Sequence, residues 1–166
     1  NENAEAHLNL AAIAAMNYDW NLAYEHVLNA EKLDLSNAKN AAAMSKGTLS
    51  IPLGEYDRAM TTLTTLPNNG WAMWRRGIMK VMSGDLSGAK SEMNNLRKLF
   101  TDNGWDDNGF IHYANAVIAA REGDSNKVSS DLKLALDNDS TGELKERLVN
   151  DVEFLNYSDA VKAAMN

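Results

Sequence analysis

The stretch Gly84-Asp85-Leu86-Ser87-Gly88-Ala89 decides the fold, because related stretches recur along the chain. One copy reads Gly54-Glu55-Tyr56-Asp57-Arg58-Ala59, a weaker copy reads Gly123-Asp124-Ser125-Asn126-Lys127-Val128, and an earlier copy reads Tyr18-Asp19-Trp20-Asn21-Leu22-Ala23. Each copy lies between two apolar stretches that have the period of a helix. A tight turn that recurs between helices indicates a stack of helical hairpins.

The spacing of these copies supports a structural repeat. The residues that follow each turn are Ala23, Ala59, Ala89 and Val128, at intervals of 36, 30 and 39 residues. We attribute the variation to the linkers between hairpins, where insertions are tolerated. Because one hairpin is too small to bury its apolar face alone, we expect neighbouring hairpins to stack on one another.

We therefore predict an all-α fold of four antiparallel helical hairpins, at residues 4–35, 37–67, 70–101 and 109–138. These hairpins occupy residues 1–139, capping helices at 140–166 follow, and we expect hairpins and cap to form a single structural domain. The linker at 34–37 places the start of the second hairpin at Ser36 or Asn37, and Asp107 lies in the longest break, 101–109. Pro52 predicts that the helix before it ends or kinks. Two short helices are expected near residues 142–149 and 158–165.

Composition and charge exclude several kinds of function. The chain has 166 residues, a net charge of −7 and a pI of about 4.9, so it lacks the basic footprint that nucleic acid requires. Its acidity also disfavours attraction to anionic membrane surfaces. It contains no cysteine, which excludes disulfides and thiolate chemistry. No run of 18 or more apolar residues occurs, so we predict no direct membrane insertion.

These residues resemble the tetratricopeptide repeat (TPR) family, in a divergent and bacterial form, over residues 4–136. That family has a small residue inside the first helix of each hairpin, and here the position holds Ala11, Gly47, Gly77 and Ala116. The pattern of its second helix here reads Ala23-Val27-Ala30, Ala59-Leu63-Leu66, Ala89-Met93-Leu96 and Val128-Leu132-Ala135. The resemblance implies a right-handed superhelix, in which the first helices line an inner groove that binds peptides.

The resemblance also implies which residues face a bound partner. Carried over to this sequence, the inner face of the first helices is apolar and aromatic. Beside this face, we expect Arg75 or Arg121 to orient the bound segment. The predicted partner-binding residues are Leu8, Met44, Trp71, Trp74, Arg75, Ile78, Phe110, Tyr113, Val117 and Arg121. Two alternatives stay open: that Trp71 and Trp74 pack against the preceding hairpin, and that Arg75-Arg76 is solvated or paired within the chain.

No motif for catalysis is found, so we predict no catalytic residue and no cofactor. His7 and His26 belong to one hairpin and are placed to face each other, but two histidines without a third ligand are weak evidence for a metal. Residues 137–142 imitate the opening of a calcium loop, yet Leu148 stands where a bidentate glutamate is needed. We therefore expect a plain helix boundary there and predict no metal site.

The sequence thus favours a non-catalytic protein–protein interaction scaffold that binds a peptide or partner segment in the inner groove. An alternative is a structural, self-associating subunit of a bacterial envelope assembly. The fold by itself does not decide between them. For the compartment we favour the periplasm or cell envelope over the cytoplasm, and because the chain has no initiating Met we expect it to be a processed form.

Overall fold

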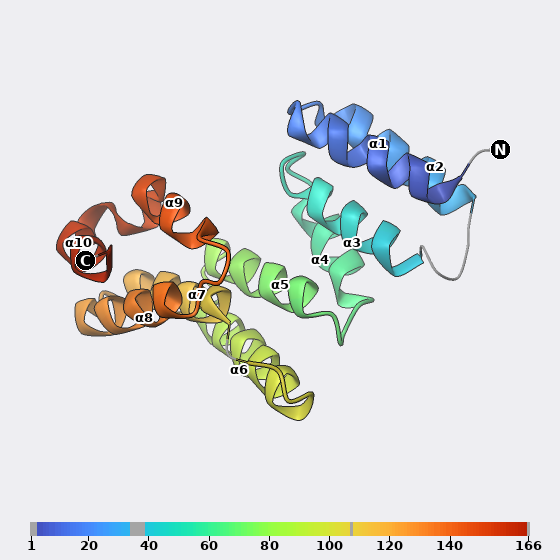
Figure 1. Ribbon diagram of the computed structural model, residues 1–166. Helices are drawn as coiled ribbons and strands as arrows, with labels where there is room; N and C mark the ends of the chain where they lie inside the picture. The colour runs from blue at the N-terminus through green and yellow to red at the C-terminus, as the bar shows by residue number, and fades with distance from the viewer. Residues whose placement is uncertain (1–2, 34–38, 107, 166) are drawn as a thin grey trace. The chain divides into compact units, whose positions relative to one another are not determined.

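The computed structural model describes residues 3–33, 39–106 and 108–165, and the regular structure of these residues is entirely helical (Figure 1). The predicted all-α fold of helical hairpins is therefore confirmed. The expected start of the second hairpin at Ser36 or Asn37, its linker and Asp107 lie outside the described residues. The chain divides into two compact units, Asn1–Arg75 and Arg76–Asn166, which are described separately below. A single structural domain and a right-handed superhelix stay predictions.

The first unit contains two complete hairpins. Helix α1 (Ala4–Met16) pairs with α2 (Trp20–Lys32), and α3 (Lys39–Ser50) pairs with α4 (Tyr56–Thr64). The two hairpins pack together mainly through α2 and α3. As predicted from Pro52, the helix before it ends, at Ser50. Helix α5 (Gly70–Met82) begins in this unit and ends in the next.

The second unit continues the same pattern and closes with short helices. Helix α6 (Leu86–Asp102) packs against α7 (Gly109–Glu122), which forms a hairpin with α8 (Ser125–Asp137). Two short helices, α9 (Glu143–Asn150) and α10 (Ser158–Met165), form where they were predicted. Between them lies the 3-10 helix η1 (Val152–Tyr157), which the sequence did not predict. Helix α10 packs on α8, and η1 packs on α7.

The repeated sequence stretch forms the same turn four times. One residue in each copy has a positive φ angle: 60° at Tyr18, 75° at Gly54, 84° at Gly84 and 77° at Gly123. The N–H of the next residue donates to the carbonyl oxygen five residues before it, at 3.0 Å for Asp19, 2.9 Å for Glu55, 2.8 Å for Asp85 and 3.0 Å for Asp124. These bonds satisfy the carbonyls at the end of the first helix. The sequence repeat is thus a repeat of one backbone conformation.

The same turn also begins the second helix of each hairpin. The carboxylates of Asp19, Asp85 and Asp124 each accept a hydrogen bond from the N–H three residues later, at 3.2, 2.9 and 3.0 Å. This is the usual cap of a helix N-terminus. The residue four positions after the cap is fully buried in all four copies: Ala23, Ala59, Ala89 and Val128. The turn therefore fixes which side of the second helix enters the core.

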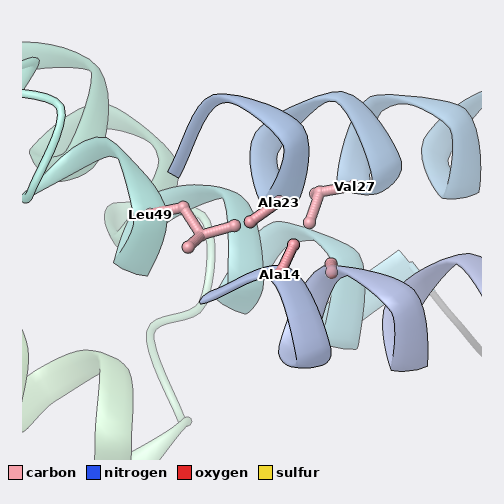
Figure 2. Close-up of a cluster of buried hydrophobic side chains, with 5 residues drawn as sticks. Ala14, Ala23, Val27 and Leu49 are labelled. Carbon is pink, nitrogen blue, oxygen red and sulfur yellow. The ribbon is translucent and has the colours of Figure 1, made fainter. Parts of the chain in front are cut away.

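Small side chains allow the helices of the first unit to approach closely. Its core cluster consists of Ala11 and Ala14 from α1, Ala23 and Val27 from α2, and Leu49 from α3. Figure 2 shows Leu49 reaching from α3 toward Ala23, Val27 and Ala14. One large side chain from the second hairpin thus completes the core of the first, which is how stacked hairpins bury apolar surface jointly.

Candidate partner-binding surface

In the fourth hairpin, the predicted partner-binding residue Tyr113 already has an aromatic neighbour. The Tyr113 ring, on α7, lies edge-to-face against Phe154 of η1, with ring centroids 5.9 Å apart and planes at 80°. The guanidinium of Arg147, on α9, lies 5.6 Å from the centre of the same ring. Both Tyr113 and Phe154 are buried. This surface of α7 is therefore covered by the chain's own C-terminal residues.

Arg121, one residue before the end of α7, is held by the same segment. Its Nε donates to one carboxylate oxygen of Glu153 at 2.6 Å, and a terminal nitrogen donates to the other oxygen. The hydrogen bonds from Arg121 to the Glu153 carboxylate raise the pKa of the guanidinium, so the pair stays charged. Such bidentate pairs fix orientation as well as charge. Arg121 is thus paired with a carboxylate of its own chain, and its role in orienting a partner segment stays a prediction.

One further contact joins η1 to α7, and a side-chain cap marks the start of η1. The Tyr157 hydroxyl donates to the Ala120 carbonyl oxygen at 2.9 Å. At the start of η1, the Asp151 carboxylate accepts from the Glu153 N–H at 2.9 Å. Burial raises the pKa of the Asp151 carboxyl, and the nearby Glu153 charge adds to the rise, while the N–H of Glu153 opposes it. Glu153, Phe154 and Tyr157 thus hold η1 against α7, and the Asp151 carboxylate caps its first turn.

The other predicted residues on α7 and the end of α5 face inward to different degrees. Phe110 and Val117 are buried, and Ile78 is half-buried. Phe110 lies at the N-terminus of α7, where the Asn108 side chain accepts from its N–H at 2.8 Å. These residues contribute to the core of the second unit, and their role in binding a partner stays a prediction.

Trp71 and Trp74 lie on one side of α5, as their spacing predicted. Their rings meet edge-to-face at 6.1 Å, and their planes are 81° apart. Trp74 is buried, whereas Trp71 is half exposed and Arg75 is half-buried. Such a pair holds the outer ring in place against the inner one. Trp71 is therefore the aromatic residue of the predicted set that presents the most surface to solvent.

Arg76 belongs to a network of charged side chains in the second unit, in agreement with the intramolecular alternative. Its guanidinium donates to both oxygens of Glu92 on α6, at 3.1 and 3.0 Å. Lys80, one turn along α5, donates to the same carboxylate at 3.2 Å. Although burial opposes it, the Arg76 guanidinium and the Lys80 ammonium hold the pKa of Glu92 below its ordinary range. The ion pair of Arg76 with Glu92 therefore links α5 to α6.

In the first unit, Leu8 and Met44 occupy equivalent positions on α1 and α3. Each lies three residues before the small residue of its helix, Ala11 or Gly47. Leu8 is partly buried against the core cluster, and Met44 is half-buried. These two side chains keep part of their apolar surface accessible on the first helices of neighbouring hairpins.

A cleft that the sequence did not predict opens beside α2, α3 and α4. Its volume is about 890 Å³. Lys46 and Glu31 both line it and pair with each other at 2.8 Å. Three hydroxyl groups and a second lysine add to the lining: Thr61, Thr62, Thr65 and Lys39. These groups can donate and accept hydrogen bonds. Their spacing along the sequence does not predict that they share a cleft.

The candidate metal ligands behave as structural groups. The Nδ1 atoms of His7 and His26 lie 3.1 Å apart, so the two rings do face each other and share a hydrogen bond. Asp139 caps α9: one carboxylate oxygen accepts from the N–H groups of Thr141 and Gly142, and the other from that of Leu144. A helix boundary is thus present at these residues, with Asp139 as its side-chain acceptor. Over the described residues, no three His, Asp or Glu side chains gather as metal ligands would.

Comparison with known proteins adds no relative. No protein-family model matches the sequence, and no curated protein is detectably similar to it. The resemblance to the TPR family therefore rests on the residues quoted above. Among the helices of the described residues, none combines the length and the apolar character that crossing a membrane requires.

Proposed function

We propose that the protein is a non-catalytic interaction scaffold built of divergent tetratricopeptide repeats. In this proposal, the first-helix faces of the hairpins bind a short segment of a partner protein. One observation carries the proposal: the α7 face binds residues 153–157 of its own chain with a buried aromatic pair and a bidentate ion pair. Catalysis is not part of this function.

The contacts on α7 are of the kind that peptide recognition uses. An aromatic side chain that enters a buried position supplies most of the binding energy at many interfaces, and Phe154 is such a residue. A bidentate arginine–carboxylate pair, here Arg121 with Glu153, adds direction and register. A first-helix face of this fold is therefore able to bind a short 3-10 segment through a few side chains.

The proposed partner site uses the first helices of the other hairpins, because the chain itself covers the face of α7. On these helices, Leu8, Met44 and Trp71 keep accessible apolar surface. Trp71 supplies the aromatic anchor in this proposal, and Arg75 lies one turn further along α5 to orient the bound segment. The partner segment then needs an apolar or aromatic residue for Trp71.

Replacing Trp71 tests the proposed site. The partner is first captured from the native extract with the wild-type protein, identified by mass spectrometry and purified, and its affinity is then measured by calorimetry. We expect Trp71→Ala to weaken binding about tenfold or more, as loss of an aromatic anchor does. Trp105→Ala is a matched control, because Trp105 is 54% exposed and Trp71 50% exposed, and Trp105 follows α6 instead of lying on a first helix.

The control separates the site from general effects of losing a tryptophan. Trp105→Ala should leave the affinity unchanged, although it removes an edge-to-face contact with Phe100 at 5.3 Å. Equal affinities of the wild-type protein and Trp71→Ala would contradict the proposed site. Equal losses in both variants would show that the effect does not come from the first-helix face.

A further inference from the structure

Helix α1 is largely apolar, but few of its residues are buried. Ten of its 13 residues are apolar, yet only Ala4, Ala11 and Ala14 are buried. Helix α7 has a similar composition, and it is buried almost all round, because α6, α8 and η1 pack on different sides of it. A helix that is hydrophobic all round is normally buried. By this comparison, part of the apolar surface of α1 lacks a cover.

The repeat identifies the side of α1 that lacks its cover. Two residues after the small residue of each first helix stands a large apolar side chain. That side chain is 6% exposed at Leu49 and 1% exposed at Ile118, but 55% exposed at Ile13. In the second hairpin it packs into the first, as Leu49 does against Ala23 and Val27 (Figure 2). Ile13 is thus an exposed copy of a residue that is buried at Leu49 and Ile118 and that, at Leu49, packs against the preceding hairpin.

A second exposed apolar row lies at the other end of the chain. Val152 and Leu155 of η1 stand three residues apart and are both exposed, and Val149, at the end of α9 before the extended Asp151, is exposed as well. In a 3-10 helix, side chains three residues apart lie on one side. Phe154, on the other side of η1, is the residue buried against Tyr113. One side of η1 therefore covers α7, and its opposite side is an apolar row in solvent.

We infer that the chain associates head to tail, with Leu10, Ile13 and Met16 of one copy packed against Val149, Val152 and Leu155 of a second copy. Both rows have three-residue spacing and both are exposed. The contact continues one that the chain already makes, since η1 binds the apolar first helix α7 with its other side. In the assembly, η1 lies between the α7 of its own copy and the α1 of the next. This association is independent of any partner peptide.

Size and charge determine how strong the contact is. A helix of 13 residues is about 20 Å long, so the contact is smaller than a standard protein interface, and the association is weak. Each copy carries a net charge of −7, so the copies repel one another at low ionic strength. Added salt screens this repulsion and should strengthen an apolar contact. We therefore expect association at high protein concentration that increases with salt.

The test measures the mass in solution by sedimentation velocity, over a range of protein and salt concentrations. The wild-type protein should form dimers and larger species as its concentration rises. Ile13→Lys and Leu155→Lys should each remain monomeric, because each removes one of the two rows. Leu134→Lys is the matched control, since Leu134 is an exposed apolar residue of α8 outside both rows, and it should associate as the wild-type protein does. Helical content from circular dichroism checks the fold of each variant.

Mixing the two monomeric variants is the decisive step. Ile13→Lys keeps the C-terminal row and Leu155→Lys keeps the α1 row, so an equal mixture should form a one-to-one dimer and nothing larger. A mixture that stays monomeric overturns the inference, as does a wild-type protein that is monomeric at every concentration. Association that depends on Ile13 but not on Leu155 would mean that α1 packs on α1, which also overturns it. If either variant fails to fold, Met16→Lys or Val152→Lys replaces it.

Discussion

Gly47 of α3 lies against Leu63 of α4 so closely that a Cβ atom on Gly47 would stand 2.7 Å from both Cγ and Cδ2 of Leu63. The equivalent pair in the third hairpin is Gly77 and Met93, where a Cβ would stand 2.3 Å from the terminal methyl carbon of Met93. Both glycines occupy the position at which a small residue was predicted. The two sites differ in the neighbour, because the Leu63 branch point is fixed and the Met93 methyl group ends a flexible chain.

We predict that Gly47→Ala destabilises the protein and that Gly77→Ala does not. In each case the higher helix propensity of alanine adds up to about 1 kcal/mol to the free energy of unfolding. At Gly47 this gain is outweighed by overpacking against Leu63, which costs about 1–3 kcal/mol. At Gly77 the Met93 methyl group moves aside, and the net change is near zero or stabilising. Urea unfolding measures both variants.

The effect of Gly47→Ala should reverse when Leu63 is shortened. In a Leu63→Ala background the added methyl group meets no branch point, so Gly47→Ala should stabilise that variant by about 1 kcal/mol. A cost that persists in this background would show that the close contact with Leu63 is not its origin.

Tyr18 occupies the turn position that the other three copies give to glycine, and its φ angle is 60°. A side chain in this left-handed conformation costs about 1–2 kcal/mol relative to glycine. The exposed Tyr18 ring recovers part of this through an edge-to-face contact with Trp20 at 5.7 Å. We predict that Tyr18→Gly stabilises the protein by about 0.5–1 kcal/mol in urea unfolding. Tyr18→Ala should destabilise it, because this variant keeps the strain and loses the ring contact, and a gain in both variants would contradict the explanation.

The turns could be predicted from the sequence because their chemistry is local. Glycine allows a positive φ angle, and the aspartate or glutamate after it marks the start of the next helix. Both features depend on hydrogen bonds between residues that are close in sequence. Pro52 ended its helix for an equally local reason. The prediction of hairpins thus depended on short stretches whose backbone bonds close within the stretch itself.

The cover of the fourth hairpin could not be predicted in the same way. Arg121 and Glu153 are 32 residues apart, and no periodic pattern connects them. Helix α7 is apolar all round, so its sequence did not tell which side would meet solvent and which would meet η1. The sequence offered one signal for this contact: an acidic residue next to an aromatic one, Glu153 and Phe154, between two predicted short helices.

We predict a large cost for removing the charge of Glu92. Its carboxylate is the common partner of Arg76 and Lys80, and the Arg76 and Glu92 side chains are both mostly buried. Glu92→Gln leaves the buried guanidinium without that anion and should lower the free energy of unfolding by about 3 kcal/mol. The control on the same helix is Asp102→Asn, which breaks an exposed pair with Lys98 and should cost less than about 0.5 kcal/mol. Similar costs in the two variants would contradict a buried network.

Two aspartates flank α9, and their contributions to the stability of the fold should change with pH in opposite directions. Burial raises the pKa of Asp151, so between its ordinary and its raised pKa the folded state binds more protons than the unfolded state. Stability from this group is present at low pH and is lost as the pH rises through that window. At Asp139, burial opposes ionisation, but hydrogen bonds from the Thr141 hydroxyl and three N–H groups lower the pKa. Stability from Asp139 is therefore present at neutral pH and is lost as the pH falls through its lowered pKa.

Asparagine at each position separates these two effects. Asp151→Asn keeps an oxygen that can accept from the Glu153 N–H, and it removes the charge of the carboxylate. It should therefore raise the urea midpoint at about pH 7. At about pH 3, where Asp151 is protonated, it should leave the midpoint unchanged. Asp139→Asn should lower the midpoint at about pH 7, because an amide has one acceptor oxygen where the carboxylate uses two. Its cost should shrink toward low pH as the wild-type carboxylate becomes protonated. If Asp151→Asn lowered the midpoint at neutral pH, the charge of Asp151 would be stabilising, which would contradict the direction of its pKa shift.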